Sequence, residues 1–321
     1  MPIITLTRCP VCGNDDIQKA LEVVDHFSSG ETFPLCHCPR CGLRFTNHFP
    51  SEETIGTYYD SPNYISHSDT RKGVANRLYH LARTIMLKRK VQLVVKHTDR
   101  QPARLLDMGC GTGYFLQAAK EKGMIVSGIE KDKGARAYAN QRFGLEVAPE
   151  EHFWELESRS FHAVTLWHVL EHIEKLNESI EKIRDILTDD GVAIIAVPNP
   201  LSVDAAFYQE YWAAYDVPRH LWHFSPRSME QLLQQHGMSI VKKQTLPLDA
   251  FYISLLSEKY KGSRWITTLA RPLCIGTMGF FRGCANPKHS SSIIYIVKKR
   301  EGAKDLSPIA NNRNFEALQN E

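Results

Sequence analysis

The stretch Ala103-Arg-Leu-Leu-Asp-Met-Gly-Cys-Gly-Thr-Gly-Tyr-Phe115 decides the fold that this sequence predicts. An apolar run ends at Asp107, and Gly109, Gly111 and Gly113 follow it. This order predicts a buried strand, a tight turn in which side chains would clash, and a helix whose first N–H groups can approach a ligand closely. A nucleotide-like ligand is expected at this turn, although a glycine-rich turn alone also serves purely structural purposes.

A second strand pattern supports a nucleotide-like ligand. After a helical pattern over 114–122, the apolar segment 124–129 leads directly to Glu130. This is the position, about 20 residues beyond the loop, from which an acidic residue reaches a ribose diol in doubly wound folds. The spacing of the loop is Gly-x-Gly-x-Gly and not Gly-x-Gly-x-x-Gly, so a dinucleotide fits it less well.

Strand and helix patterns continue to alternate along the chain, which predicts an α/β fold with a doubly wound, mainly parallel seven-stranded sheet. An amphipathic helix over 73–97 precedes the first strand. The later strand patterns cover residues 145–147, 161–167, 191–197, 238–245 and 291–298, and helical patterns cover 133–143, 176–187 and 225–235.

From about residue 105 to residue 197 the sequence resembles the class I S-adenosylmethionine-dependent methyltransferases. The resemblance rests on the Asp-x-Gly-x-Gly-x-Gly loop and on the acidic residue after the second strand. It implies S-adenosylmethionine as the cofactor and a closing antiparallel edge strand near the C-terminus. It also implies a cofactor site, with Phe115 packing beside it, made of Asp107, Gly109, Gly111, Gly113, Glu130 and Trp167.

Two near-copies of one cysteine turn mark the N-terminal region: Cys9-Pro-Val-Cys12-Gly and Cys38-Pro-Arg-Cys41-Gly. Two such turns facing each other offer four thiolates in the tetrahedral arrangement that suits a structural Zn²⁺ ion. Cys36 and His37 are spare donors, either of which could replace one of the four. We therefore predict a small zinc-ribbon-like unit. A zinc unit ahead of such a domain also resembles the deoxysugar C-methyltransferases.

Directly after the fourth strand pattern comes His168-Val-Leu-Glu171-His172. On a helix these positions share one face, so the three polar side chains can meet one ligand. The spacing also matches the His-x-x-Glu-His motif of zinc peptidases, but here it follows a parallel strand and a cofactor loop, which argues against a peptidase. Within the family resemblance, residues 170–172 are similar to a Leu-Glu-His step that lines the junction between the methyl group and the acceptor.

An insertion over 201–221 is expected to build the acceptor side, because excursions from the carboxyl edge of a sheet commonly carry specificity. His220 and His223 stand at its end, in a Pro-Arg-His-x-x-His-Phe-Ser-Pro string that resembles family members associated with sugar or polysaccharide biosynthesis. The insertion also carries the aromatic residues Phe207, Tyr208, Tyr211, Trp212 and Tyr215.

We expect a histidine near neutrality to deprotonate an oxygen or carbon nucleophile, with His172 and His220 or His223 as candidates. The acceptor is expected to be a small molecule, of sugar type or linked to a lipid. A rival interpretation places a divalent metal on His168, Glu171, His172 and a loop histidine. It resembles the Glu-x-x-Glu-His step of ubiquinone-pathway and small-RNA 2′-O-methyltransferases. A non-catalytic zinc-ribbon binding module is a third interpretation, which the intact glycine loop argues against.

Composition gives no reason to expect a nucleic-acid partner, because the net charge is +3 for 321 residues. No apolar run of about 20 residues predicts a transmembrane segment, and the absence of a signal-like N-terminus predicts a cytoplasmic protein. The expected organisation is a zinc-ribbon-like domain over 1–48, a helical lid or linker over 49–100 and a cofactor-binding domain over 101–300. Acceptor-site insertions are expected at 200–224 and 246–288, and a disordered tail at 301–321.

Overall fold

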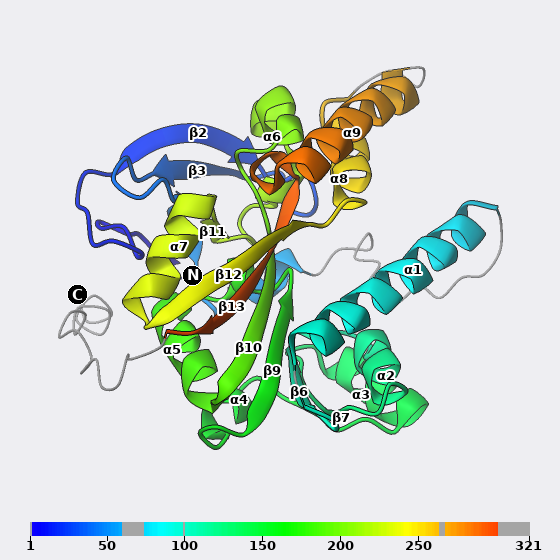
Figure 1. The fold of residues 1–321 in the computed structure, drawn as a ribbon. Coiled ribbons are helices and arrows are strands. Elements are labelled where there is room, and N and C mark those ends of the chain that lie inside the picture. The colour runs from blue at the N-terminus through cyan, green and yellow to red at the C-terminus, as the bar shows by residue number, and fades with distance from the viewer. Residues whose placement is uncertain (1, 60–73, 99, 263–266, 301–321) are drawn as a thin grey trace.

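A computed structural model describes residues 2–59, 74–98, 100–262 and 267–300 of the chain. Its centre is a seven-stranded sheet in the order β12-β13-β10-β9-β6-β7-β8, flanked by helices on both faces (Figure 1). The strands are β6 (Arg104–Met108), β7 (Ile125–Ile129), β8 (Val147–Ala148), β9 (Phe161–Trp167), β10 (Leu187–Pro198), β12 (Met238–Thr245) and β13 (Ser292–Lys299). The predicted doubly wound α/β fold is confirmed. The predicted tail at 301–321 lies outside the described residues.

Neighbouring residues of the central strands enter two separate cores, because side chains alternate between the faces of a strand. Leu106 and Ile195 face a core shared with α5 (Leu176–Ile186) and α7 (Pro226–Gln235). Leu105 and Ile194 face the other core. That core is completed by α1 (Val74–His97), α2 (Tyr114–Lys120) and α3 (Lys133–Phe143).

The last strand corrects one detail of the expected topology. Strand β13 is antiparallel, but it lies between β10 and β12 and is not the edge of the sheet. Its first six residues, 292–297, are all buried, whereas β12 is half exposed. A continuous apolar run such as Ile293-Ile-Tyr-Ile-Val297 is typical of a strand covered on both faces.

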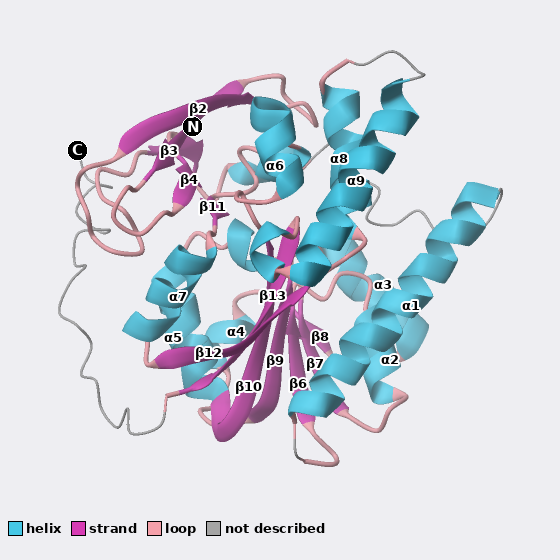
Figure 2. Ribbon diagram, turned by 45° about the horizontal axis from the view of Figure 1, so that its top comes forward, coloured by secondary structure: helices cyan, strands magenta, loops and turns pink. Residues whose placement is uncertain are grey.

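The N-terminal region forms its own sheet, in the order β11-β4-β3-β2, which lies above the carboxyl ends of the parallel strands (Figure 2). Its strands are β2 (Gln18–Val24), β3 (Thr32–His37) and β4 (Arg44–Thr46), and a small pair joins β1 (Ile3–Ile4) to β5 (Phe49–Pro50). The fourth strand, β11 (Trp222–His223), comes from the insertion after β10 and pairs with β4. Segments far apart in the sequence thus share one sheet.

The aromatic residues of the insertion are largely packed inside the protein. The insertion contains α6 (Val203–Tyr208) and two 3-10 turns, η3 (Gln209–Tyr211) and η4 (Ala213–Tyr215). Tyr208, Trp212 and Tyr215 are buried in a core with Phe33 and Leu35 of the N-terminal sheet. These three rings therefore join the insertion to the N-terminal sheet, and the expectation that they form an acceptor surface does not fit their burial.

Two further helices, α8 (Asp249–Tyr260) and α9 (Thr267–Ala285), pack against each other at the same end of the sheet. In the described part of the chain, neither these nor the other helices combine the length and apolar character needed to span a bilayer.

Candidate functional site

The glycine loop lies at the carboxyl ends of β6 and β7. Gly109, Gly111 and Gly113 all have positive φ angles, of 62°, 54° and 79°. A Cβ atom on Gly109 would lie 2.5 Å from Val169, and one on Gly113 would lie 2.7 Å from Leu145, so close packing demands both glycines. A Cβ on Gly111 would meet nothing within 4 Å. Gly111 is therefore the glycine of this loop that borders open space.

Two carboxylates lie at the glycine loop, and one of them bonds directly to its backbone. Glu130 accepts a hydrogen bond from the Gly111 N–H at 2.7 Å. Asp107 is buried at the end of β6 and accepts one from the hydroxyl of Thr165 at 2.6 Å. Burial raises the pKa of Asp107 to about 7, although the Thr165 hydrogen bond and Lys90 act in the other direction. A cationic ligand beside Asp107 would therefore stabilise its charged form.

The end of β9 adds aromatic surface to the site. The ring of Trp167 lies 5.6 Å from that of Phe115, edge to face. The Nζ atom of Lys90 lies 4.4 Å from the centre of the Trp167 ring. The indole N–H of Trp167 is buried without a hydrogen-bond partner among the described residues. The sequence did not predict Lys90 as a site residue, although a lysine inside the apolar stripe of a helix is a signal that could identify it.

The structure separates His168 from the other predicted histidines. Its Nδ1 lies 3.3 Å from Glu171 Oε1, and its Nε2 lies 3.0 Å from Asp249 Oδ2 on α8. Burial alone would lower the pKa of His168, but the hydrogen bonds to Asp249 and Glu171 raise it to about 10. His168 is thus a charged link between the β9 loop and α8. Nothing in the sequence distinguished Asp249 from an ordinary acid in the first turn of a helix.

A second group comprises Glu171, His172 and His220, whose ligand atoms all lie within 4.8 Å of one another. Glu171 is fully buried, and its Oε2 atom has no hydrogen-bond partner among the described residues. The His172 and His220 rings meet edge to face, 4.5 Å apart. Burial, and then His220, lower the pKa of His172 to about 4. His172 is therefore neutral at physiological pH.

Backbone carbonyl groups fix the tautomers of these two rings. The Nδ1 of His172 lies 3.0 Å from the carbonyl oxygen of Arg219, and the Nδ1 of His220 lies 2.8 Å from that of Ala214. A carbonyl oxygen only accepts hydrogen bonds, so in each neutral ring Nδ1 carries the proton. Both Nε2 atoms consequently keep a lone pair that can accept a proton or bind a metal.

His223 does not join this group. It lies on β11, where its Nε2 is 3.4 Å from the hydroxyl of Thr46 and its ring packs edge to face on Tyr215. Burial lowers its pKa well below the usual value. Of the two insertion histidines that the sequence indicated, the structure brings only His220 to Glu171 and His172.

Arg219 fixes the segment that carries His220. Its guanidinium donates to Asp25 at 3.0 Å, to Asp216 at 2.7 Å and to the Tyr58 carbonyl at 2.8 Å. The hydroxyl of Tyr59 lies 3.1 Å from Nδ1 of His172. One buried cation therefore joins the N-terminal sheet, the insertion and the segment before α1. Sequence periodicity gives no signal for such a contact.

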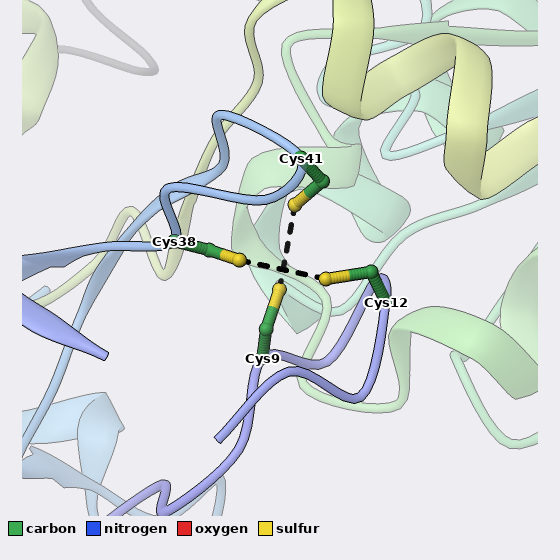
Figure 3. Close-up of side chains that lie close together, drawn as sticks. All are labelled: Cys9, Cys12, Cys38 and Cys41. Atoms are coloured by element: carbon green, nitrogen blue, oxygen red, sulfur yellow. Dashed lines mark hydrogen bonds between the residues drawn. The ribbon is translucent and has the colours of Figure 1, made fainter. Parts of the chain in front are cut away.

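The four predicted cysteines form the second of the two groups in the described residues that could hold a metal (Figure 3). Cys9 and Cys41 have their Sγ atoms 3.5 Å apart, and Cys12 and Cys38 have theirs 3.4 Å apart. Zn–S bonds of about 2.3 Å in a tetrahedron place sulfurs roughly 3.8 Å apart, so the group fits a zinc ion closely. Cys36 and His37 are not members of the group.

The two cysteine turns share one geometry. Gly13 donates its N–H to the Cys9 carbonyl at 2.9 Å, and Gly42 donates its N–H to the Cys38 carbonyl at 2.8 Å. Both glycines have positive φ, at 67° and 78°. The repeated Cys-Pro-x-Cys-Gly pattern therefore specifies the local backbone as well as the donors.

Comparison with known proteins gives one family. A family model described as "Methyltransferase domain" matches residues 79–243, which is slightly more than half of the chain. In a solved S-adenosylmethionine-dependent methyltransferase from Archaeoglobus fulgidus, similarity covers 68% of this chain and 94% of that one, with a TM-score of 0.48 and 19% identity.

Curated relatives are distant. A protein of Geobacillus sp. (strain WCH70) that carries a methyltransferase name is 28% identical over 151 residues, covering 43% of this chain and 61% of the relative. The ubiquinone biosynthesis O-methyltransferase of Rickettsia canadensis is 24% identical over 198 residues, covering 58% of this chain and 84% of the relative. The chain thus spans less than two thirds of the first of these relatives.

The link between His168 and α8 should be visible in the pH dependence of stability. Folding raises the pKa of His168. The contribution of its charged form to the free energy of unfolding is therefore complete below about pH 6.5 and is lost as the pH rises through about 10. Asp249→Asn should lower the free energy of unfolding at pH 6 by about 1.5–3 kcal/mol, measured by urea denaturation. The difference from wild type should shrink by pH 10. Asp189→Asn, at an exposed carboxylate, is the control and should change stability by less than about 0.5 kcal/mol. An equal deficit at both pH values would contradict the assignment.

Proposed function

The chain belongs to the family of methyltransferase domains, and on this premise we propose that it transfers a methyl group from S-adenosylmethionine to a small-molecule or sugar-type acceptor. The observation that carries the proposal is the pairing of Glu130 with the open Gly111 turn, beside the group of Glu171, His172 and His220. A cofactor turn and a proton acceptor at the ends of neighbouring parallel strands suit methyl transfer to an acceptor that must lose a proton.

The residues around the turn fit this cofactor. Gly111 leaves room for a ligand against its backbone, and the indole N–H of Trp167 has no partner among the described residues. Glu130 would hold the ribose hydroxyls, Asp107 would face the amino group, and Trp167 and Phe115 would pack on the cofactor. When bound, S-adenosylmethionine supplies an electrophilic methyl group on its sulfonium. The remaining work is alignment of the acceptor and removal of its proton.

We assign proton removal to His220. Its Nε2 carries the lone pair, and Asp216 Oδ2 lies 3.8 Å away, where it would stabilise the protonated ring. His172 is a poorer base because its pKa is lowered to about 4. His168 is assigned a positioning role, since both of its ring nitrogens contact carboxylates. The proposal covers oxygen and carbon nucleophiles, because a neutral imidazole can accept a proton from either. The name of the Rickettsia relative supports an oxygen nucleophile.

A second candidate is metal-assisted methyl transfer. Glu171 Oε2 has no partner in the described part of the chain, and two Nε2 lone pairs lie nearby, so the group could bind one cation. Such a cation would lower the pKa of an acceptor hydroxyl. His168 would not be a ligand here, because Asp249 and Glu171 engage both of its nitrogens.

We also propose that the four cysteines hold a structural zinc ion. The short distances between their sulfur atoms support it. So does their packing: Cys9, Cys38 and Cys41 are buried in the same core as residues of the central sheet, and Cys12 packs against that core. Because the turns pack on this core, the ion would stabilise the cofactor domain together with the N-terminal sheet.

Cofactor binding can be measured without knowing the acceptor. Isothermal titration with S-adenosylmethionine should show binding to the wild-type chain and at least tenfold weaker binding to Glu130→Ala, which is a loss of about 1.4 kcal/mol or more. Glu146→Ala, at an exposed carboxylate near the same sheet edge, is the matched control and should bind as wild type. Failure of the wild-type chain to bind would refute the proposed function. A screen with isotopically labelled methyl groups would then identify the acceptor.

Elemental analysis tests the zinc assignment. The purified chain should contain about one zinc ion, and Cys38→Ser or Cys9→Ser should lose it and unfold at a lower temperature. Cys274→Ser changes an exposed cysteine on α9 and should keep the metal. Full zinc content in Cys38→Ser would show that another set of donors binds the ion.

The same measurement separates the two catalytic candidates. With His220 acting as a base and no second metal, the metal content of His172→Ala and His220→Ala should equal that of the wild-type chain after incubation with Zn²⁺, Mn²⁺ or Mg²⁺. The metal-assisted reaction would be established instead if the wild-type chain binds a second equivalent of metal ion. Both variants should then lose this second ion, and His236→Ala should retain it. His236 is a suitable control because it follows the C-terminal end of α7, bonds to Asn177 and belongs to neither group of possible metal ligands in the described residues.

A further inference from the structure

The pair of helices α8 and α9 exposes an apolar surface that the proposed methyl transfer does not use. Nine of the sixteen large apolar side chains that are exposed in the described residues lie in segments 201–208 and 248–281. This exceeds the scatter of single exposed side chains found on any protein surface. We call the part carried by the two helices the apolar helix face. Its members are Leu248, Tyr252, Leu255, Leu269, Leu273, Met278 and Phe281.

Helical periodicity places these residues on the outer sides of the two helices. Leu248, Tyr252 and Leu255 follow the spacing i, i+4, i+7, which is one stripe of a helix. On α9, Leu273 and Phe281 are 62% and 66% exposed. The glycines of α9 mark the side on which it contacts its neighbours: a Cβ on Gly276 would lie 2.6 Å from Phe251 on α8. The apolar face is therefore the outer surface of a tightly packed helix pair.

The exposed charges that the two helices and the turn after them carry have a single sign among the described residues. Between residues 248 and 289 the sequence has two acidic residues, Asp249 and Glu258. Both are paired, with His168 and with Arg271 respectively. The exposed charges of the segment are cations. They are Lys259, Lys261, Arg282 and Lys288.

We propose that the apolar helix face docks on the surface of an anionic lipid bilayer, with the apolar side chains at the acyl boundary and the cations among the headgroups. In the described part of the chain, the two helices that carry this apolar surface expose basic residues and no acidic ones, which makes them complementary to such a bilayer. A symmetric contact between two copies of the chain fits less well, because it would bring the same cations together, and the described residues of α8 and α9 expose no acid to neutralise them. The proposal does not depend on methyl transfer.

Vesicle sedimentation tests the proposal with the full chain. The wild-type chain should sediment with phosphatidylcholine vesicles that contain phosphatidylglycerol, bind pure phosphatidylcholine more weakly, and be released by salt. Leu273→Glu combined with Phe281→Glu should abolish sedimentation. Arg282→Gln should weaken binding to the anionic vesicles about fivefold, which corresponds to about 1 kcal/mol per basic residue near the surface.

Val241→Glu is the matched control, because Val241 is 52% exposed on β12 and lies outside the apolar helix face. It should bind vesicles as the wild type does. Circular dichroism and thermal unfolding would show whether each variant is folded. The proposal is overturned if folded wild-type chain does not sediment at low salt, or if the double variant binds equally. If light scattering shows that the wild-type chain is a dimer and the double variant is a monomer, the face binds a second copy of the chain instead.

Discussion

The candidate site depends on one short backbone segment, residues 219–223, which is held from both sides by hydrogen bonds. The Leu221 N–H donates to the carbonyl of Glu171 at 2.8 Å, and the Thr46 N–H donates to the carbonyl of Leu221 at 2.9 Å. This segment carries His220 and ends in strand β11, which completes the N-terminal sheet. The position of the proposed base therefore depends on a sheet that begins more than 170 residues earlier in the chain.

The polar groups of the site fall into two electrostatic classes. His168 is charged because two carboxylates surround it, and it joins the β9 loop to α8. His172 is kept neutral by burial and by its histidine neighbour. Ionisable groups whose environments push their pKa values apart are typical of sites in which one group positions and another reacts. His168 and His172 are four residues apart in the sequence, and their pKa values differ because different groups pack against them.

The sequence predicted what local pattern can encode and missed what long-range contacts decide. The glycine loop, Glu130 and the alternating elements follow from spacing, because each strand and turn imposes its own periodicity. Likewise, the sequence predicted the paired cysteine turns because the repeated pattern specifies both the sulfur donors and the backbone turn. By contrast, Asp249, Arg219 and strand β11 act through partners far away in the chain, for which periodicity has no signal. The burial of Trp212 shows the same limit, because the sequence alone does not distinguish a loop aromatic residue that lines a site from one that fills a core.

The contact between Gly109 and Val169 has a consequence for how such a chain can diversify. Any side chain at position 109 would overlap Val169, and Val169 lies two residues before Glu171. A substitution in the cofactor loop therefore requires a compensating substitution in the loop that bears the reactive groups. Lineages that remodel their acceptor chemistry are expected to alter the two positions together, as a pair of compensating substitutions, while the strands beneath them remain unchanged.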